Sequence, residues 1–293
     1  MEPATLNTMQ LARRNQVDRT VGAILVDSGK LPPDSIEAIL RLQKEEGLRF
    51  GDAAVKLGML TPEEVQYALA RQFDYPYLSE GDEAVSDELV AAYRPYSPQV
   101  EALRALRSQL MLRWFTGADD RKALAVVSPG AGEGRSYLAA NLALVFSQLG
   151  ERTLLIDADM RHPKQHTLFK LENRSGLSSI LANRSTANEV RRIPAFVDLS
   201  VITGGPPPPN PQELLSRPVF AKFIAAIGRD YDAIIIDTPA AVDYADAQAI
   251  AVATRGALLL TRKNHTPLRR TGQLWSGLSH YGVAMVGAVL NDF

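Results

Sequence analysis

The chain has 293 residues, enough for about two domains of ordinary size. Hydrophobic residues make up 46% of it and charged residues 22%, which indicates a globular protein and excludes a disordered or fibrous one. The 32 Lys and Arg are balanced by 33 Asp and Glu, and this formal net charge of -1 argues against nucleic acid as a partner. Any anion site must therefore be local.

The sequence contains no cysteine, which excludes disulfides, thiolate catalysis and Cys-ligated zinc. Residues 1–16 lack the apolar core of a signal peptide, and no stretch approaches the ~18 apolar residues of a membrane-spanning helix. We therefore expect a cytosolic protein.

Residues 20–72 contain an internal repeat with a period of 29 residues. Gly22 recurs as Gly51 and Gly29 recurs as Gly58, with apolar positions kept in register between them. Each copy predicts a short helix, a glycine stop and a second amphipathic helix. We expect residues 1–80 to form a small all-helical domain of two packed hairpins.

Residues 81–97 interrupt this pattern, with acidic residues first and prolines last, which predicts an inter-domain linker. A helical stretch over 98–115 follows. Beyond it come continuous apolar runs, typical of strands buried on both faces of a mostly parallel sheet, at residues 123–127, 153–156, 199–202, 233–236, 257–260 and 284–290. The sequence predicts a doubly wound α/β domain over residues 98–293.

A glycine-rich loop joins the first of these strands to a helix. Backbone N–H groups of such a loop, at a helix N-terminus, wrap a phosphate. The candidate phosphate-binding residues are Gly130, Ala131, Gly132, Glu133, Gly134, Arg135, Ser136 and Tyr137. Pro129 and Arg135 depart from the first Gly and the Lys of the G-x-x-x-x-G-K-[ST] pattern. A glycine turn that only caps the helix is the alternative.

Aspartates follow two of the other predicted strands. Asp157 and Asp159 leave the tip of one strand, and Asp237 leaves the tip of another. Ligands of doubly wound sheets bind at these carboxyl ends, where carboxylates hold Mg²⁺ or accept a proton. Such aspartates also serve as helix caps or turn formers.

This combination resembles the bacterial tyrosine kinases, P-loop autokinases of polysaccharide export, over residues 98–293. The Walker A motif corresponds to residues 130–136, the Walker A′ motif (an apolar run, D-x-D, then Arg) to residues 156–161, and Walker B to residues 236–239. Residues 208–215 are similar to the family's P-N-P-x-E-L-L segment, although a polyproline loop before a helix would read the same way.

The resemblance implies phosphoryl transfer from ATP, with Mg²⁺, to a tyrosine hydroxyl. Arg135 and the loop N–H groups would hold the β- and γ-phosphates. Ser136 would ligate Mg²⁺ directly and Asp237 through water. Asp157 and Asp159 would orient the metal and accept the tyrosine proton, with Asp159 as the base. Arg262 would contact the adenine base or the phosphates; a plain surface arginine is the alternative.

Glu101, Arg104 and Arg107 match the E-x-x-R-x-x-R motif through which family members assemble into a ring. Steps of three residues keep all three on one helix face. A solvated face with an intrahelical Glu–Arg pair is the alternative.

Family members usually end in a tail of clustered tyrosines, which is absent here. Tyr93 and Tyr96, in the predicted linker, are candidate acceptors, or else packing residues. The chain looks most like the EpsG-type autokinases, which implies activation by a membrane chain-length determinant protein and peripheral recruitment to the inner membrane.

The repeat resembles the N-terminal module of type II secretion ATPases, some of which bind cyclic di-GMP. The positions that match the binding motif are Arg49, Gly51 and Gly22, whereas Thr20 replaces the arginine of the first copy. A protein-docking module that keeps only the helical core is the alternative.

Two other functions remain open for the α/β domain. One is an ATPase switch of the partition or division-site type, similar to ParA and MinD, without tyrosine kinase activity. Gly130 stands where those ATPases carry a signature Lys, which disfavours this interpretation. The other is a nucleotide-binding scaffold of weak turnover with a cyclic di-GMP-responsive N-terminal module.

Overall fold

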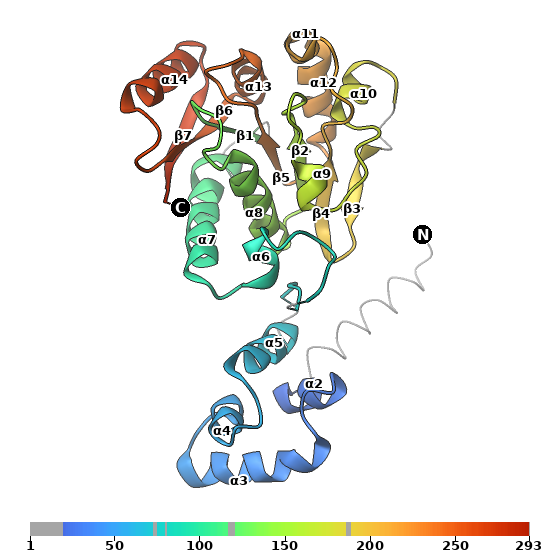
Figure 1. The fold of residues 1–293 in the computed structure, drawn as a ribbon, viewed down its shortest axis with the longest axis vertical. Coiled ribbons are helices and arrows are strands. Elements are labelled where there is room, and N and C mark those ends of the chain that lie inside the picture. Colours follow the sequence, from blue (N-terminus) through green and yellow to red (C-terminus); the bar gives the residue numbers. More distant parts are fainter. Residues whose placement is uncertain (1–19, 73–74, 80, 117–120, 186–188, 293) are drawn as a thin grey trace. The chain divides into compact units, whose positions relative to one another are not determined.

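The structure is a computed structural model that describes residues 20–72, 75–79, 81–116, 121–185 and 189–292 (Figure 1). The chain divides into two compact units, Met1–Ser79 and Glu80–Phe293. In the described ranges, no helix combines the length and apolar character needed to cross a membrane.

In its described residues, the first unit contains helices and no strand, as the repeat predicts. Its elements are α2 (Val21–Asp27), η1 (Pro33–Ser35), α3 (Ile36–Glu46), α4 (Phe50–Lys56) and α5 (Pro62–Gln72). The glycine stops adopt the left-handed conformation that favours glycine, with φ of 71° at Gly29 and 68° at Gly58. A shared apolar core holds the helices together, formed by Ile24, Leu25, Leu31, Ile39, Ala53, Ala54, Leu60 and Ala68.

Local side-chain bonds fix where two of these helices begin. The Thr20 hydroxyl accepts a hydrogen bond from the Ala23 N–H at 3.3 Å. At the start of α5, Thr61 Oγ1 accepts from the Glu64 N–H at 3.3 Å, while a Glu64 carboxylate oxygen accepts from the Thr61 N–H at 2.9 Å. This reciprocal capping box satisfies N–H groups that the helix itself leaves unpaired.

The second unit is built on a seven-stranded sheet of order β3-β4-β2-β5-β1-β6-β7. The strands are β1 (Ala123–Val127), β2 (Thr153–Asp157), β3 (Arg191–Ile193), β4 (Phe196–Ile202), β5 (Ala233–Asp237), β6 (Gly256–Arg262) and β7 (Ala284–Asn291). Every pairing is parallel except β3 with β4. All six predicted strands are present, so the doubly wound α/β prediction is confirmed.

Helices cover both faces of this sheet (Figure 1). They are α6 (Val90–Tyr93), α7 (Pro98–Leu110) with the π-helical turn η2 (Met111–Phe115), α8 (Arg135–Ser147), α9 (Gln165–Leu168), α10 (Leu177–Leu181), α11 (Pro211–Ser216), α12 (Pro218–Ile227), α13 (Asp246–Thr254) and α14 (Leu268–His280). One core joins alternate strand residues to α10–α14. The central helix α8 is buried from Leu138 to Ser147 and packs on the other face.

The prediction that residues 81–97 form an inter-domain linker is wrong, because this segment packs against the α/β unit. Leu89 and Ala91 are fully buried. Two amide side chains of the α8 region complete the hydrogen bonds of this segment: Asn141 Oδ1 accepts from the Ala91 N–H at 3.0 Å, and Gln148 Nε2 donates to the Ala91 carbonyl at 2.8 Å. The segment therefore belongs to the second unit, which begins at Glu80.

Candidate functional site

The glycine-rich loop runs from the end of β1 to the first turn of α8. Gly132 and Gly134 adopt positive φ angles of 70° and 96°, a conformation that residues with a Cβ rarely take. Gly134 is also the N-cap of α8, so the helix begins directly where the loop ends. A glycine-rich loop between a strand and a helix N-terminus is the arrangement in which backbone N–H groups bind phosphate.

Arg135 connects the loop to the end of β5. Its Nε donates to the Thr238 carbonyl at 2.8 Å, and its Nη1 donates to Ser128 Oγ and to the Gly130 carbonyl. Its positive charge lies close enough to Asp237 to lower the pKa of that carboxyl. The planar fork of arginine thus serves several carbonyls at once, which a single ammonium at this position would not do in the same way.

Glu133 braces the loop through its side chain. The carboxylate is buried, and it accepts hydrogen bonds from the Gly130 N–H at 2.9 Å and from Thr266 Oγ1 at 2.6 Å. Asn291 Nδ2, at the end of β7, donates to the Glu133 carbonyl at 3.1 Å. The sequence marked Glu133 only as part of the loop; its bracing role depends on residues more than a hundred positions later.

Two buried carboxylates lie side by side beneath the loop. Asp157 and Asp237 are register partners on the parallel strands β2 and β5, and neither is exposed. One oxygen of Asp157 accepts from the backbone N–H groups of Lys164 and Gln165, each at 2.9 Å. Gln165 Nε2 also donates to Asp237 Oδ2 at 2.8 Å and to the Ser136 carbonyl at 3.1 Å. The sequence analysis missed Gln165, because nothing in its local pattern distinguishes it.

Burial controls the protonation of this pair. It raises the pKa of Asp157 well above its usual value, and the neighbouring charge of Asp237 raises it further. Burial also raises the pKa of Asp237, from 3.8 to about 6, against the opposing hydrogen bonds of Ser136 and Gln165 and the charge of Arg135. The charge of Arg135 therefore offsets only part of the cost of burying these two carboxylates.

The chemistry of this donor set fits Mg²⁺. Asp157 Oδ1, Asp237 Oδ1 and Gln165 Oε1 are buried and have no hydrogen-bond partner. Buried oxygens of this kind suit a hard cation, and Mg²⁺ keeps several waters and takes only one or two protein carboxylates. Across the described ranges, no cluster of three or more His, Cys, Asp or Glu side chains is placed to hold a metal. Two carboxylates with the Ser136 hydroxyl are the smaller set expected of a nucleotide-bound magnesium.

Asp159 is held differently from the other two. Its Oδ1 accepts from the Arg161 N–H at 3.2 Å and from the His162 N–H at 3.0 Å, which closes the turn after β2. Its charge raises the pKa of both Asp157 and Asp237, so the fold brings all three predicted aspartates together.

Arg161, the last residue of the D-x-D-x-R motif, pairs with a residue that the sequence did not mark. Its Nε donates to Asp246 Oδ2 at 2.7 Å and its Nη2 to Asp246 Oδ1 at 3.3 Å. Asp246 is buried at the start of α13. The guanidinium carbon also lies 3.7 Å from the centre of the Tyr244 ring, a cation–π contact.

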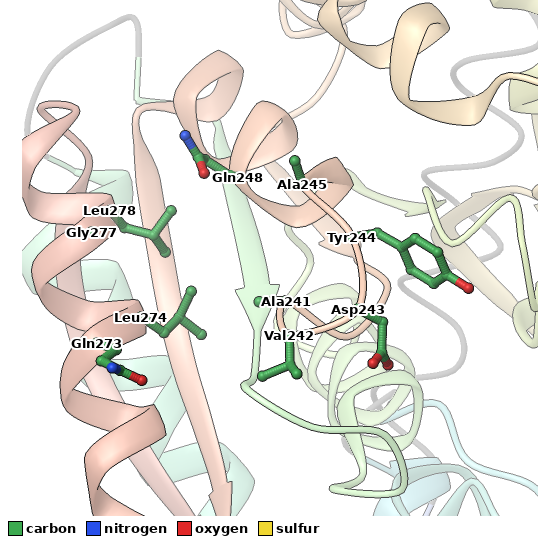
Figure 2. Close-up of a pocket in the computed structure, with 10 residues that line it drawn as sticks. All are labelled: Ala241, Val242, Asp243, Tyr244, Ala245, Gln248, Gln273, Leu274, Gly277 and Leu278. Carbon is green, nitrogen blue, oxygen red and sulfur yellow. The ribbon is translucent and has the colours of Figure 1, made fainter.

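The remaining predicted nucleotide contacts lie at the edges of the loop. Arg262, at the end of β6, donates from Nη1 to the Gly132 carbonyl at 3.2 Å. Tyr137, in the first turn of α8, is partly buried, and burial, aided by the charge of Glu88, raises its pKa. A cavity of about 310 Å³ lies nearby, between residues 241–245, α13 and α14 (Figure 2).

The predicted ring motif lies on α7. Glu101 forms an ion pair with Arg104 of the same helix, and the Glu101 side chain is 61% exposed. Arg107 turns inward, and its Nη1 donates to the Val145 carbonyl of α8 at 2.7 Å. Within one chain, this motif therefore forms an intrahelical pair and an anchor between two helices.

A family model described as an AAA domain matches residues 121–265. The putative tyrosine-protein kinase CapB of Staphylococcus aureus is 36% identical over 202 residues, which cover 68% of this chain and 86% of that relative.

Solved structures extend this likeness to three dimensions. The chimerical protein CapA2B2 has a TM-score of 0.65 at 31% identity, covering 77% of this chain and 97% of that one. The kinase domain of the Escherichia coli tyrosine kinase ETK has a TM-score of 0.67 at 28% identity, covering 75% and 85%. The Pyrococcus furiosus cell division ATPase MinD, at 22% identity and a TM-score of 0.51 over 58% of this chain and 71% of that one, shares the fold alone. The chain therefore belongs to the bacterial tyrosine-protein kinase family.

Proposed function

We propose that this chain is an ATP-dependent tyrosine autokinase that works with a membrane chain-length determinant protein in exopolysaccharide synthesis. The observation that carries the kinase assignment is the pair of adjacent buried carboxylates with unpaired oxygens beside the glycine-rich loop. Two adjacent buried carboxylates, offset only in part by Arg135, are costly to ionise unless a further cation joins them. Magnesium bound with ATP would supply that charge.

The loop and two arginines would hold the nucleotide. The N–H groups of residues 130–136 and the positive end of α8 would bind the phosphates, with Arg135 turning from its loop carbonyls toward the β- and γ-phosphates. Arg262, already beside Gly132, would contact the adenine base or the phosphates.

The metal would be held by Ser136 directly, by Asp237 through water and by Asp157. Bound Mg²⁺ would neutralise charge on the transferring phosphoryl group. Asp157 and Asp237 are fixed for this purpose by Gln165, which bonds to both through its backbone N–H and its side chain. The rigid pair would meet the metal with little rearrangement.

Asp159 would accept the proton of the acceptor tyrosine. Asp159 is 8% exposed, whereas Asp157 is fully buried and its carboxylate accepts hydrogen bonds from two backbone N–H groups. An unperturbed tyrosine has a pKa of about 10, so a positioned carboxylate assists loss of its proton at neutral pH.

The partner and the assembly are further parts of the proposal. We infer from the resemblance to the EpsG-type autokinases that a membrane partner activates the cytosolic kinase and recruits it to the inner membrane. Glu101, Arg104 and Arg107 would contribute to a homo-oligomeric ring, with Glu101 exposed for contact with a neighbouring copy. The helical unit, residues 1–80, would bind cyclic di-GMP through Arg49 and the first turns of α2 and α4, which contain Gly22 and Gly51.

The kinase activity is tested by incubating the protein with Mg²⁺-ATP and the cytosolic tail of the partner, then measuring phosphotyrosine and ADP. We expect phosphotyrosine in the wild type and its loss in Asp237→Asn, because the metal site loses a charge. Asp230→Asn, which removes an exposed carboxylate of the same unit, is the matched control and should behave as wild type. ADP without phosphotyrosine would instead indicate a MinD-type ATPase, and neither product would indicate a scaffold.

A further inference from the structure

Tyr244 lies at the edge of the sheet where the candidate site is built. It belongs to the loop between β5 and α13, seven residues after Asp237. Its side chain is 39% exposed. Tyr244 is one of the residues that line the cavity, and Figure 2 shows its ring projecting from this loop on the side away from Leu274 and Leu278 of α14.

The ring is stacked on a motif of the site. The Arg161 guanidinium carbon lies 3.7 Å from the ring centre, and the Arg161 backbone N–H donates to Asp159 Oδ1 at 3.2 Å. Asp246 orients the same guanidinium from the other side with two hydrogen bonds. Tyr244 therefore contacts, through its ring, the arginine whose backbone N–H is bonded to the proposed base, Asp159.

Tyr93 and Tyr281 are placed less favourably. The Tyr93 hydroxyl donates to backbone carbonyls of Asp82 and Val85, at 2.7 Å and 2.8 Å, which corrects its interpretation as a mobile linker residue. Tyr281 is 58% exposed, but it lies between the end of α14 and the start of β7. It is therefore at the amino ends of the parallel strands, whereas the candidate site is at their carboxyl ends. Exposure alone therefore does not select Tyr244; its position at the carboxyl edge does.

We propose that Tyr244 is a phosphoacceptor of this kinase, an inference that rests on the proposed tyrosine kinase activity. The Tyr244 hydroxyl oxygen forms a bond to the γ-phosphorus of ATP, the bond from that phosphorus to the β,γ-bridging oxygen breaks, and ADP leaves with the electron pair. The phenolic proton passes to the Asp159 carboxylate. In the product, the new phosphate lies on a tyrosine that already contacts the Arg161 guanidinium, a group suited to binding phosphate.

The test uses the full chain, incubated with Mg²⁺-ATP and then digested with trypsin for mass spectrometry. Cleavage after Arg229 and Arg255 releases one peptide, residues 230–255, that contains Tyr231 and Tyr244. Fragment ions separate the two tyrosines. We expect phosphate on Tyr244, and its complete loss from this peptide in Tyr244→Phe.

The phenylalanine variant keeps the ring on Arg161 and removes only the acceptor oxygen. Transfer to an added Glu/Tyr copolymer should therefore be unchanged in Tyr244→Phe, and Tyr281→Phe should keep the wild-type phosphorylation of the 230–255 peptide. Phosphate on Tyr96 or other tyrosines with none on Tyr244 would overturn this inference and leave the kinase intact. No phosphotyrosine on the chain or on the copolymer would overturn the proposed function, and this inference with it.

Discussion

Asp237 is ionised in the unfolded chain at a pH where it is still protonated in the fold. Its pKa rises from 3.8 to about 6 on burial, so between these values the native state binds more protons than the unfolded state. Stability from this group is therefore lost as the pH rises from about 4 to about 6, and the penalty is complete above that range. The raised pKa of Asp157 acts in the same direction.

We expect Asp237→Asn to stabilise the nucleotide-free protein at neutral pH while abolishing phosphotransfer. A shift of this size corresponds to at most about 3 kcal/mol, which is an order of magnitude for one buried group. The stability gain is checked by measuring the melting temperatures of both proteins with and without Mg²⁺, at neutral pH and at a pH near the pKa of the unfolded carboxyl. The gain should shrink at the acidic pH, and added Mg²⁺ should raise the melting temperature of the wild type more than that of the variant. Equal gains at both pH values would contradict the assignment of the shift to Asp237.

Residues of the site differ in how far the sequence reveals them. Asp157 and Asp237 were predictable, because a buried apolar run ends at each and parallel strands bring such ends together. Gln165, Asp246 and Tyr244 were not, because each acts through a partner supplied by another element. The Arg161–Asp246 pair spans 85 positions, and no local pattern encodes it.

At the scale of elements, burial decides what the sequence shows. Five of the six predicted strands were predictable because their apolar runs are buried in the sheet, whereas β7 was found from its apolar composition although its residues are exposed or only partly buried. β3 was missed because Arg191 and Arg192 are exposed on an antiparallel edge strand. The segment 81–97 was misassigned because its acidic and proline-rich composition matches a linker, whereas its burial depends on Asn141 and Gln148 of a later helix region.

Packing accounts for the repeated glycines of the helical unit. A Cβ on Gly51 would lie 2.3 Å from Val65 Cγ1, and one on Gly22 would lie 3.1 Å from Phe50 Cζ. Helix contacts of this kind require glycine whether or not a ligand binds. Packing therefore explains Gly22 and Gly51 but not the exposed Arg49, the third residue matched to cyclic di-GMP binders.

Calorimetric titration of the full chain with cyclic di-GMP tests whether the helical unit binds this nucleotide through Arg49. We expect a binding heat in the wild type and its loss in Arg49→Ala, because an arginine beside the phosphates would be removed. Arg41→Ala, an exposed arginine of α3 in the same unit, should retain the heat. A wild type without heat, or equal heats in both variants, would favour a protein-docking module.

At the scale of the whole molecule, the proposed ring depends on whether Glu101 also contacts a neighbouring copy of the chain. Within the chain it pairs with Arg104, an exposed i,i+3 pair that contributes little to stability on its own. Between chains, the same carboxylate would be buried in an interface, where reversing its charge is far more disruptive.

We expect Glu101→Arg to dissociate the assembled protein into smaller species, measured by sedimentation velocity over a range of concentrations. Glu213→Arg, which reverses an exposed charge on α11, should leave the assembly unchanged. If Glu101→Arg sediments like the wild type, or if the wild type is a monomer at every concentration, the motif serves only the α7 helix.

The bond from Asn291 to the Glu133 carbonyl has a consequence for how the protein matures. Glu133 braces the phosphate loop near the middle of the chain, whereas its supporting amide emerges from the ribosome 158 residues later. Thr266, which donates the other hydrogen bond to Glu133 from a later element, is synthesised 133 residues after it. A nascent chain that has already exposed its entire glycine loop would thus hold nucleotide weakly, and full affinity would appear only once β7 has been synthesised and added to the sheet.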